Sequence, residues 1–217
     1  MIIWKFFSII FHPIFIPFLT IYLATNYIDC IDITFSFNNH IIYWGFITFT
    51  FILPICITSS LIFFKTRVFS FQTTSFIMKK KEERALPLCI SFLFSILGIL
   101  FFYKLSNIDS FVLSFYFSVS FFYLISFLIS LRFKISLHMI SIGSCVSTFL
   151  FIHVNFCDTA LFLLGSFILS CILFFSRVFL RSHNNREAYI GFFLGIVFQY
   201  LFLFFYFNNF YNLNPSF

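Results

Sequence analysis

Long apolar runs separated by short polar loops extend along the whole chain. The runs are continuous and do not alternate between apolar and polar residues, which favours helices over strands. Crossing the hydrocarbon core of a bilayer takes about 20 helical residues. The pattern predicts seven membrane spans, near residues 6–26, 41–64, 86–103, 111–131, 136–154, 159–176 and 188–207. We therefore expect an all-α fold, a polytopic membrane bundle of about six to seven transmembrane helices.

The first apolar run has features of both a leader and a span. It begins after Lys5 and resembles a signal peptide, but no small-residue cleavage site follows it, so we interpret it as a span. Pro13 and Pro17 in this run, and Pro54 in the second, predict kinks, because proline has no backbone N–H. We interpret His12, beside Pro13, as a capping or packing residue.

Charge divides the loops into two kinds. Twelve of the 13 Lys and Arg residues fall on one side of the predicted membrane, namely Lys5, Lys65, Arg67, Lys79, Lys80, Lys81, Arg84, Arg132, Lys134, Arg177, Arg181 and Arg186. The other side carries Lys104 with Asp29, Asp32, Asp109 and Asp158. If one span were missed, the basic loops would fall on both sides of the membrane. Their location on one side therefore supports the predicted number of spans. The positive-inside rule makes the basic side cytoplasmic.

Composition excludes an ordinary soluble domain. Hydrophobic residues make up 61% of the chain and charged residues only 9%, against about 25% charged in soluble domains. We interpret most of the 43 Phe residues as lipid-facing. The net charge of +6 indicates membrane topology and not a nucleic-acid partner, because the basic residues lie in short loops. We expect one integral domain, 1–217, in a bacterial inner (cell) membrane, with its oligomeric state open.

The cysteines, the glycines and the remaining histidines provide little further evidence about function. The six cysteines include no Cys-x-x-Cys pair, and we expect small buried hydrophobes instead of metal ligands or disulfide partners. Gly191 and Gly195 form a Gly-x-x-x-Gly step, which predicts close helix packing in the last span. His40 and His153 lie on the acidic side with no partner nearby, and we expect no function for them.

Three segments on the basic side hold nearly all the reactive side chains. They are Lys79–Pro87, Arg132–His138 and Ser176–Glu187. Two predicted spans separate each segment from the next, and an even number of crossings returns the chain to the same face. We expect all three segments to meet at one membrane surface.

The third segment has the most informative spacing. His183 and Glu187 are four residues apart, so on a helix they share a face. A carboxylate on one imidazole nitrogen fixes the tautomer and leaves the other nitrogen to attack. Asn184 or Asn185 is positioned to cap the final helix, whose N-terminus favours a phosphate. Arg177 is suited to a bidentate grip on phosphate oxygens.

The first two segments add further polar groups. His138 starts the fifth predicted span, and a second histidine suits a general acid that protonates a leaving oxygen. Lys79, Arg84 and Lys134 are expected to neutralise the remaining charge of a transferred phosphoryl group.

These segments resemble the signatures of the type 2 phosphatidic acid phosphatase superfamily. Ser176-Arg177, His183 and Glu187 match the spacing of Ser-Arg-x5-His-x3-Asp, with Glu in place of Asp. In the second signature, Pro-Ser-Gly-His, only Ser136 and His138 match.

The first signature, Lys-x6-Arg-Pro, shows the largest departures. Lys79 and Pro87 are correctly spaced, but Leu86 stands where Arg belongs, and Arg84 lies two residues early. The resemblance covers about residues 79–200, a phosphatase-like core region that follows two N-terminal spans within 1–64.

The resemblance implies a mechanism and a set of roles. His183 would be the nucleophile that forms a phosphohistidine, Glu187 would orient it, and His138 would protonate the leaving lipid alcohol. The groups that would bind phosphate are Arg177, Lys79, Arg84, Ser136 and Lys134. No metal or other cofactor is implied. The substrate would be a lipid phosphate or a polyprenyl diphosphate drawn from the membrane lipids.

Two alternatives stay open. The chain is either such a hydrolase or a catalytically degenerate membrane protein that binds anionic lipid or a protein partner. A transporter is a third option, although no charged residue lies deep in a predicted span to mark an ion path.

Overall fold

The fold is taken from a computed structural model that describes residues 2–13, 15–28, 44–45, 47–66, 82–103 and 110–208. All regular secondary structure within these ranges is helical, which agrees with the all-α prediction. The chain divides into two compact units, Met1–Ile33 with Ser136–Phe217, and Thr34–Ile135. Residues 79–135 of the expected core region therefore belong to the second unit and residues 136–200 to the first.

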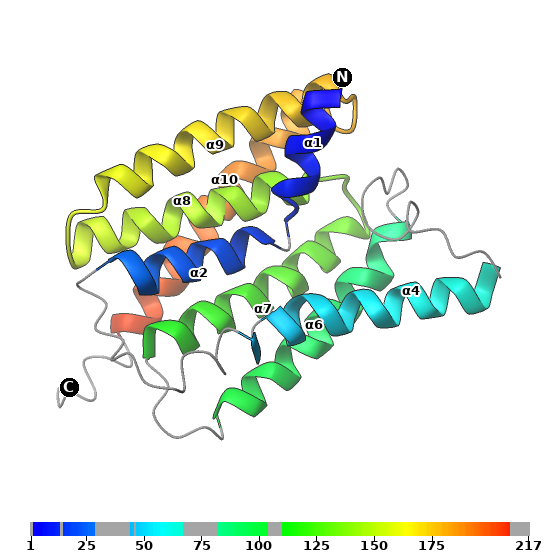
Figure 1. Cartoon of the computed structure of the whole chain (residues 1–217), viewed down its shortest axis with the longest axis horizontal. Helices are drawn as coiled ribbons and strands as arrows, with labels where there is room; N and C mark the ends of the chain where they lie inside the picture. The colour runs from blue at the N-terminus through cyan, green and yellow to red at the C-terminus, as the bar shows by residue number, and fades with distance from the viewer. Residues whose placement is uncertain are drawn as a thin grey trace. The chain divides into compact units, whose positions relative to one another are not determined.

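The first unit is built around one central helix. It contains α1 (Ile2–Ile10), α2 (Phe15–Tyr27), α8 (Leu137–Asn155), α9 (Ala160–Phe179) and α10 (Asn185–Tyr206). Helix α8 packs against α2, α9 and α10 (Figure 1). It is 72% buried, whereas α9 and α10 are each 28% buried. Helices α9 and α10 therefore present most of their surface outward, as helices facing lipid would.

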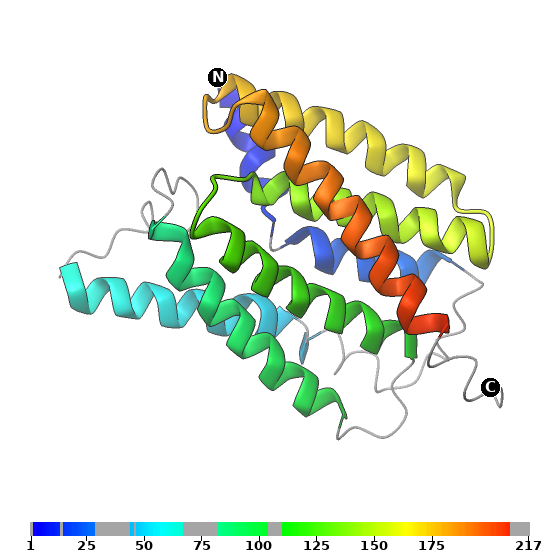
Figure 2. The ribbon, with the colours of Figure 1, turned by 180° about the vertical axis from the view of Figure 1, so that it is seen from behind.

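Helices α8 and α10 run in the same direction and touch through their backbones (Figure 2). A Cβ added to Gly195 would collide with the carbonyl oxygen of Ile140 and lie 3.1 Å from the Cα of Gly143. The hydroxyl of Ser147 donates to the carbonyl oxygen of Ile196 at 2.8 Å. The predicted close packing at Gly195 is thus present, and its partner is Gly143.

The first predicted span, 6–26, is wrong as a single span because the helix is interrupted. Pro13 has no N–H to continue the helical ladder, and the carbonyl oxygen of His12 instead accepts from the N–H of Phe15 at 2.8 Å. The interruption leaves helices of 9 and 13 residues, and neither reaches the length of a membrane span. Pro17 lies in the first turn of α2, where proline is tolerated.

The second unit contains a π-helical turn, η1 (Thr48–Ile52), continuous with α4 (Leu53–Thr66), and helices α6 (Glu82–Tyr103) and α7 (Ser110–Ser130). Helix α6 packs against α7, α4 and η1. It begins four residues before the predicted span at 86, so Arg84, Leu86 and Pro87 are helical residues.

Four helices in the described residues are long and apolar enough to cross a membrane, which indicates a membrane protein. They are Phe111–Ser130, Leu137–Asn155, Ala160–Phe179 and Asn185–Tyr206. The apolar helices Thr48–Thr58 and Ala85–Phe101 are shorter. The predicted count of six to seven spans is therefore not confirmed.

The contact between α8 and α10 gives a testable expectation. Gly195→Ala should lower the thermal unfolding midpoint in detergent, because the new methyl group must push two backbones apart, at a cost of about 1–3 kcal/mol. Gly165→Ala in α9 is the matched control, since a Cβ there meets nothing within 4 Å. Equal midpoints for the two variants would contradict the close packing.

Candidate functional site

The turn between α9 and α10 brings Arg177 and His183 together. The N–H of Ser182 donates to the carbonyl oxygen of Arg177 at 3.1 Å, and the N–H of Arg181 donates to that of Val178 at 2.9 Å. Arg181 has a φ of 51°, so it occupies the left-handed position of a helix C-terminal Schellman turn. The N–H of His183 also approaches the carbonyl oxygen of Arg177, at 3.4 Å. The five residues between Arg177 and His183 in the sequence therefore form this turn.

His183 and Glu187 form the predicted pair. The Nδ1 of His183 donates to the Oε2 of Glu187 at 2.7 Å, and the two side chains are 2% and 21% exposed. Because a carboxylate oxygen accepts, the ring proton lies on Nδ1 and the lone pair of a neutral ring lies on Nε2. The predicted shared helix face is wrong, however. His183 precedes α10, which begins at Asn185, and the helix cap brings the pair together.

Asn184 is that cap. Its Oδ1 accepts from the N–H of Glu187 at 2.7 Å, and its Nδ2 donates to the Oε1 of Glu187 at 3.3 Å. The same residue therefore satisfies a free N–H at the start of α10 and holds the carboxylate. His183 consequently lies directly before a helix N-terminus, where the helix dipole favours an anion.

Both residues of the Ser-Arg pair bond to α1. The hydroxyl of Ser176 donates to the carbonyl oxygen of Trp4 at 2.8 Å. The Nη1 of Arg177 donates to the Oγ of Ser8 at 2.6 Å, and Arg177 is only 7% exposed. The sequence did not predict that the N-terminal helix reaches this pair.

His138 lies at the same end of the first unit. Its Nε2 is 3.0 Å from the carbonyl oxygen of Ser8 and 3.4 Å from the hydroxyl oxygen of Ser8. A carbonyl oxygen only accepts, so Nε2 carries the proton. The hydroxyl of the same Ser8 accepts from Arg177 at 2.6 Å. Ser8 therefore joins His138 to Arg177 at one end of the first unit, and His183 follows Arg177 in the turn after α9.

Ser136 joins the second segment to the third through its backbone. Its N–H donates to the carbonyl oxygen of Glu187 at 3.5 Å. Its hydroxyl is buried and makes no hydrogen bond within the part of the chain that the structure describes. A buried hydroxyl beside these groups suits the hydrogen-bonding role that the sequence predicted.

The other three predicted phosphate-binding residues do not belong to this cluster as described. Arg84 and Lys134 are residues of the second unit, and Lys79 lies outside the described residues. The site is thus described from Ser136, His138, Arg177, His183 and Glu187, all in the first unit. Within the described ranges, no three His, Cys, Asp or Glu side chains are grouped to hold a metal ion.

Sequence reasoning missed Ser8 and His12. His12 is 5% exposed and its ring contacts that of His138 edge to face, with centroids 5.5 Å apart. The hydroxyl of Ser141 in α8 donates to the carbonyl oxygen of Pro13 at 2.9 Å, which fixes the break between α1 and α2 against α8. The available signal was the His12-Pro13 pair, since polar groups at a helix break often line a site in membrane proteins.

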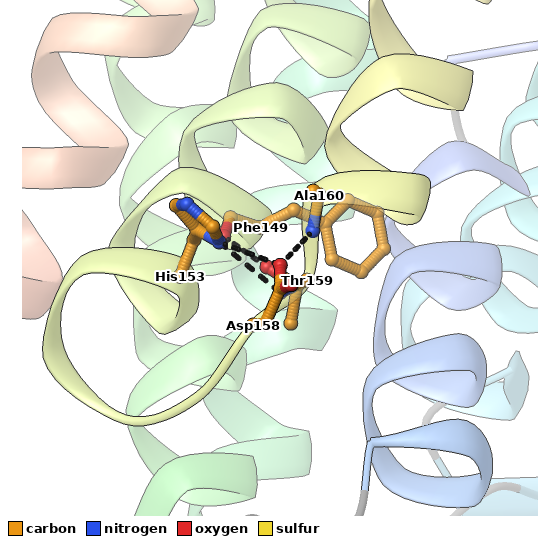
Figure 3. Close-up of polar contacts among 5 residues, drawn as sticks. All are labelled: Phe149, His153, Asp158, Thr159 and Ala160. Atoms are coloured by element: carbon orange, nitrogen blue, oxygen red, sulfur yellow. Dashed lines mark hydrogen bonds and ion pairs between the residues drawn. The ribbon is translucent and has the colours of Figure 1, made fainter.

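The contacts at the opposite end of α8 show that two predictions were wrong, one about His153 and one about the cysteines. Figure 3 shows that His153 has partners, because its Nδ1 accepts from the N–H of Thr159 at 3.1 Å and lies 3.3 Å from Asp158. The N–H of Ala160 donates to Asp158 at 2.8 Å. Cys157, in the same loop, is disulfide-bonded, so the expectation that no cysteine forms a disulfide is wrong.

No family model matches the chain, and no curated protein or solved structure matches it either.

The cap of α10 makes a stability prediction. Asn184→Ala should lower the thermal midpoint of the detergent-solubilised protein, because losing a helix cap costs about 1 kcal/mol. The adjacent exposed residue supplies the control, and Asn185→Ala should leave the midpoint close to that of the wild type. If both alanine variants melted alike, Asn184 would not be the cap.

Proposed function

We propose that this chain is an integral membrane phosphohydrolase that removes a phosphate from a lipid phosphate or a polyprenyl diphosphate through a phosphohistidine on His183. The reaction uses no metal. A polytopic helix bundle in a bacterial inner membrane would carry the site, with the lipid tail of the substrate in the bilayer and its headgroup at the basic face. The sequence leaves phosphatidate, phosphatidylglycerol phosphate and a polyprenyl diphosphate as the substrates to compare.

The observation that supports the proposal most is the buried bond between His183 and Glu187. It holds the proton on Nδ1 and directs the lone pair to Nε2. A nucleophile that an adjacent group holds in its reactive form is typical of covalent catalysis. Arg177 and His138 both bond to Ser8 at the same end of the unit, which supports a nucleophile, a cation and a proton donor acting together.

The chemistry follows from these groups. The Nε2 lone pair of His183 attacks phosphorus, and the bond from phosphorus to the lipid oxygen breaks. His138, in its doubly protonated form, transfers a ring proton to that oxygen and becomes neutral, so the alcohol leaves uncharged. Glu187 stabilises the positive charge on the phosphorylated ring, and Arg177 stabilises the charge on the phosphoryl oxygens. A water molecule then attacks phosphorus, and the bond from phosphorus to the Nε2 of His183 breaks. One proton of the water passes to the neutral His138, and inorganic phosphate is released.

One observation favours the non-enzymatic alternative. Ser8 already bonds to both Arg177 and His138, so these residues also serve to hold α1 against α8 and α9. Arg181 and Arg186 are exposed at this end, which suits an anionic lipid surface. On this alternative the protein binds anionic vesicles and releases no phosphate.

The assay that separates the two is phosphate release by the purified protein in detergent, without added metal. The wild type should hydrolyse at least one of the three lipid classes. His183→Ala should lower the rate by a factor on the order of 10³ or more, because the nucleophile is gone. His138→Ala should lower it by about 10²–10⁴, the usual contribution of a general acid.

His153→Ala is the matched control, since His153 lies at the other end of α8 and should be dispensable. Unchanged activity in His183→Ala would end the histidine mechanism. No phosphate release from any of the three lipids, together with binding to anionic vesicles, would favour the alternative.

A further inference from the structure

Ser8 is the one described residue that bonds to both Arg177 and His138. Its hydroxyl oxygen accepts from Arg177 at 2.6 Å, and its carbonyl oxygen accepts from the Nε2 of His138 at 3.0 Å. Ser8 itself is 7% exposed. It therefore lies between a residue of the third segment and a residue of the second, which are separated by 39 positions in the sequence.

Helix α1 is docked at this place by further contacts. The hydroxyl of Ser176 donates to the carbonyl oxygen of Trp4 at 2.8 Å, and the ring of Trp4 stacks on that of Phe179 at 5.3 Å. Figures 1 and 2 both show α1 against the C-terminal end of α9. Ser8 is thus held by packing and not only by its own bonds, which suits a residue that must hold others in place.

The two bonds of Ser8 have different chemical consequences. The carbonyl oxygen fixes the proton of His138 on Nε2, and any side chain at position 8 would keep this bond. The hydroxyl takes one of the five N–H groups of the Arg177 guanidinium and fixes its orientation. The hydroxyl oxygen also lies 3.4 Å from the Nε2 of His138. Replacing the side chain therefore removes the shorter bond to Arg177 and this longer contact, and keeps the carbonyl bond to His138.

We propose that Ser8 is a positioning residue of the phosphate site, whose hydroxyl orients Arg177 toward the phosphoryl oxygens. The inference rests on the proposed function. It places part of the site on the N-terminal helix, outside all three segments that the sequence singled out. The opposite role, in which the Ser8 hydroxyl occupies the place of a phosphate oxygen on Arg177, predicts an effect of the opposite sign.

Orthovanadate, a phosphate analogue, makes the test independent of turnover. Its binding is measured as the rise in thermal midpoint of the detergent-solubilised full chain. We expect the wild type to bind vanadate and Ser8→Ala to bind it about tenfold more weakly, because a hydrogen bond to a charged group is lost. The KM for the lipid substrate should rise by a similar factor, with a smaller change in kcat.

Ser170→Ala is the matched control. Ser170 is also buried, at 6% exposure, and its hydroxyl bonds only to the carbonyl oxygen of Phe167 in its own helix. It should bind vanadate as the wild type does, and Ser8→Thr, which restores a hydroxyl, should recover most of the lost affinity.

The outcomes are distinct. Unchanged vanadate affinity in Ser8→Ala would overturn the positioning role and leave the proposed function standing. Tighter binding would overturn it in favour of the blocking role. A wild-type protein that neither binds vanadate nor releases phosphate would overturn the proposed function, and this inference with it.

The two ends of α8 carry an independent inference about orientation. His138 is the second residue of α8 and the disulfide-bonded Cys157 follows its last residue. At 1.5 Å per residue the two ends lie about 28 Å apart, close to the thickness of the hydrocarbon core. Disulfides persist in oxidising compartments and are rare in the cytosol.

We infer that the Cys157 end faces the oxidising side and that the end with His138 and His183 faces the cytoplasm. The charge of the loops gives the same orientation, since Arg177, Arg181 and Arg186 lie at the histidine end and Asp158 lies at the cysteine end. With the site on the cytoplasmic side, the substrate of the proposed phosphatase is a lipid whose phosphate group lies at the cytoplasmic leaflet.

Two exposed positions test the orientation without reference to activity. Val154→Cys, at the cysteine end, should react with a membrane-impermeant maleimide in intact bacterial cells. Arg181→Cys, at the histidine end, should react only after the cells are permeabilised. Each is compared with the wild-type chain to subtract its native thiols. The reverse pattern of labelling would overturn the orientation while leaving the phosphatase proposal intact.

Discussion

The backbone contact between α8 and α10 is the constraint on which the site depends. Because Gly143 and Gly195 allow the two helices to touch, the starts of both helices are held at one end of the first unit. Ser136, directly before α8, then donates to the backbone of Glu187 in the first turn of α10. His138 and His183 belong to these two helix starts, so a wider helix pair would separate them. Packing in the apolar interior thus fixes the geometry of a polar cluster about two to three turns away.

The cluster is assembled from helix ends, and this has a physical reason. In an apolar bundle the free N–H and C=O groups of a helix end need partners, and polar side chains supply them. Here the C-terminal turn of α9, the capped start of α10, the start of α8 and the break after α1 meet. Groups that complete the hydrogen bonding of the backbone are thereby gathered around Arg177 and the histidines. The same residues therefore serve stability and the proposed chemistry.

The two ends of α8 differ in character. One end carries His138 and Arg177, which both bond to Ser8 of α1, whereas the other carries a His153–Asp158 pair beside a disulfide. Neutral, small and hydroxyl side chains lie between them, including Ser144, Ser147 and Thr148, whose hydroxyls bond to backbone carbonyl oxygens. Such serines and threonines are tolerated in apolar surroundings because a nearby carbonyl satisfies them. Chemistry that involves charge is thus confined to the helix ends.

The sequence by itself determined the helical membrane class and the local geometry of the third segment. A continuous apolar run in lipid forms a helix because its backbone N–H and C=O groups need partners within the run. The sequence also predicted the contact between His183 and Glu187 and a cap at Asn184 or Asn185, because these residues are only a few positions apart. The tertiary structure decided that Ser8 reaches Arg177, that Gly143 faces Gly195 and that Cys157 forms a disulfide. These contacts join positions far apart in the chain. Many apolar helix faces are interchangeable as packing partners, and only the packing of the whole unit selects among them.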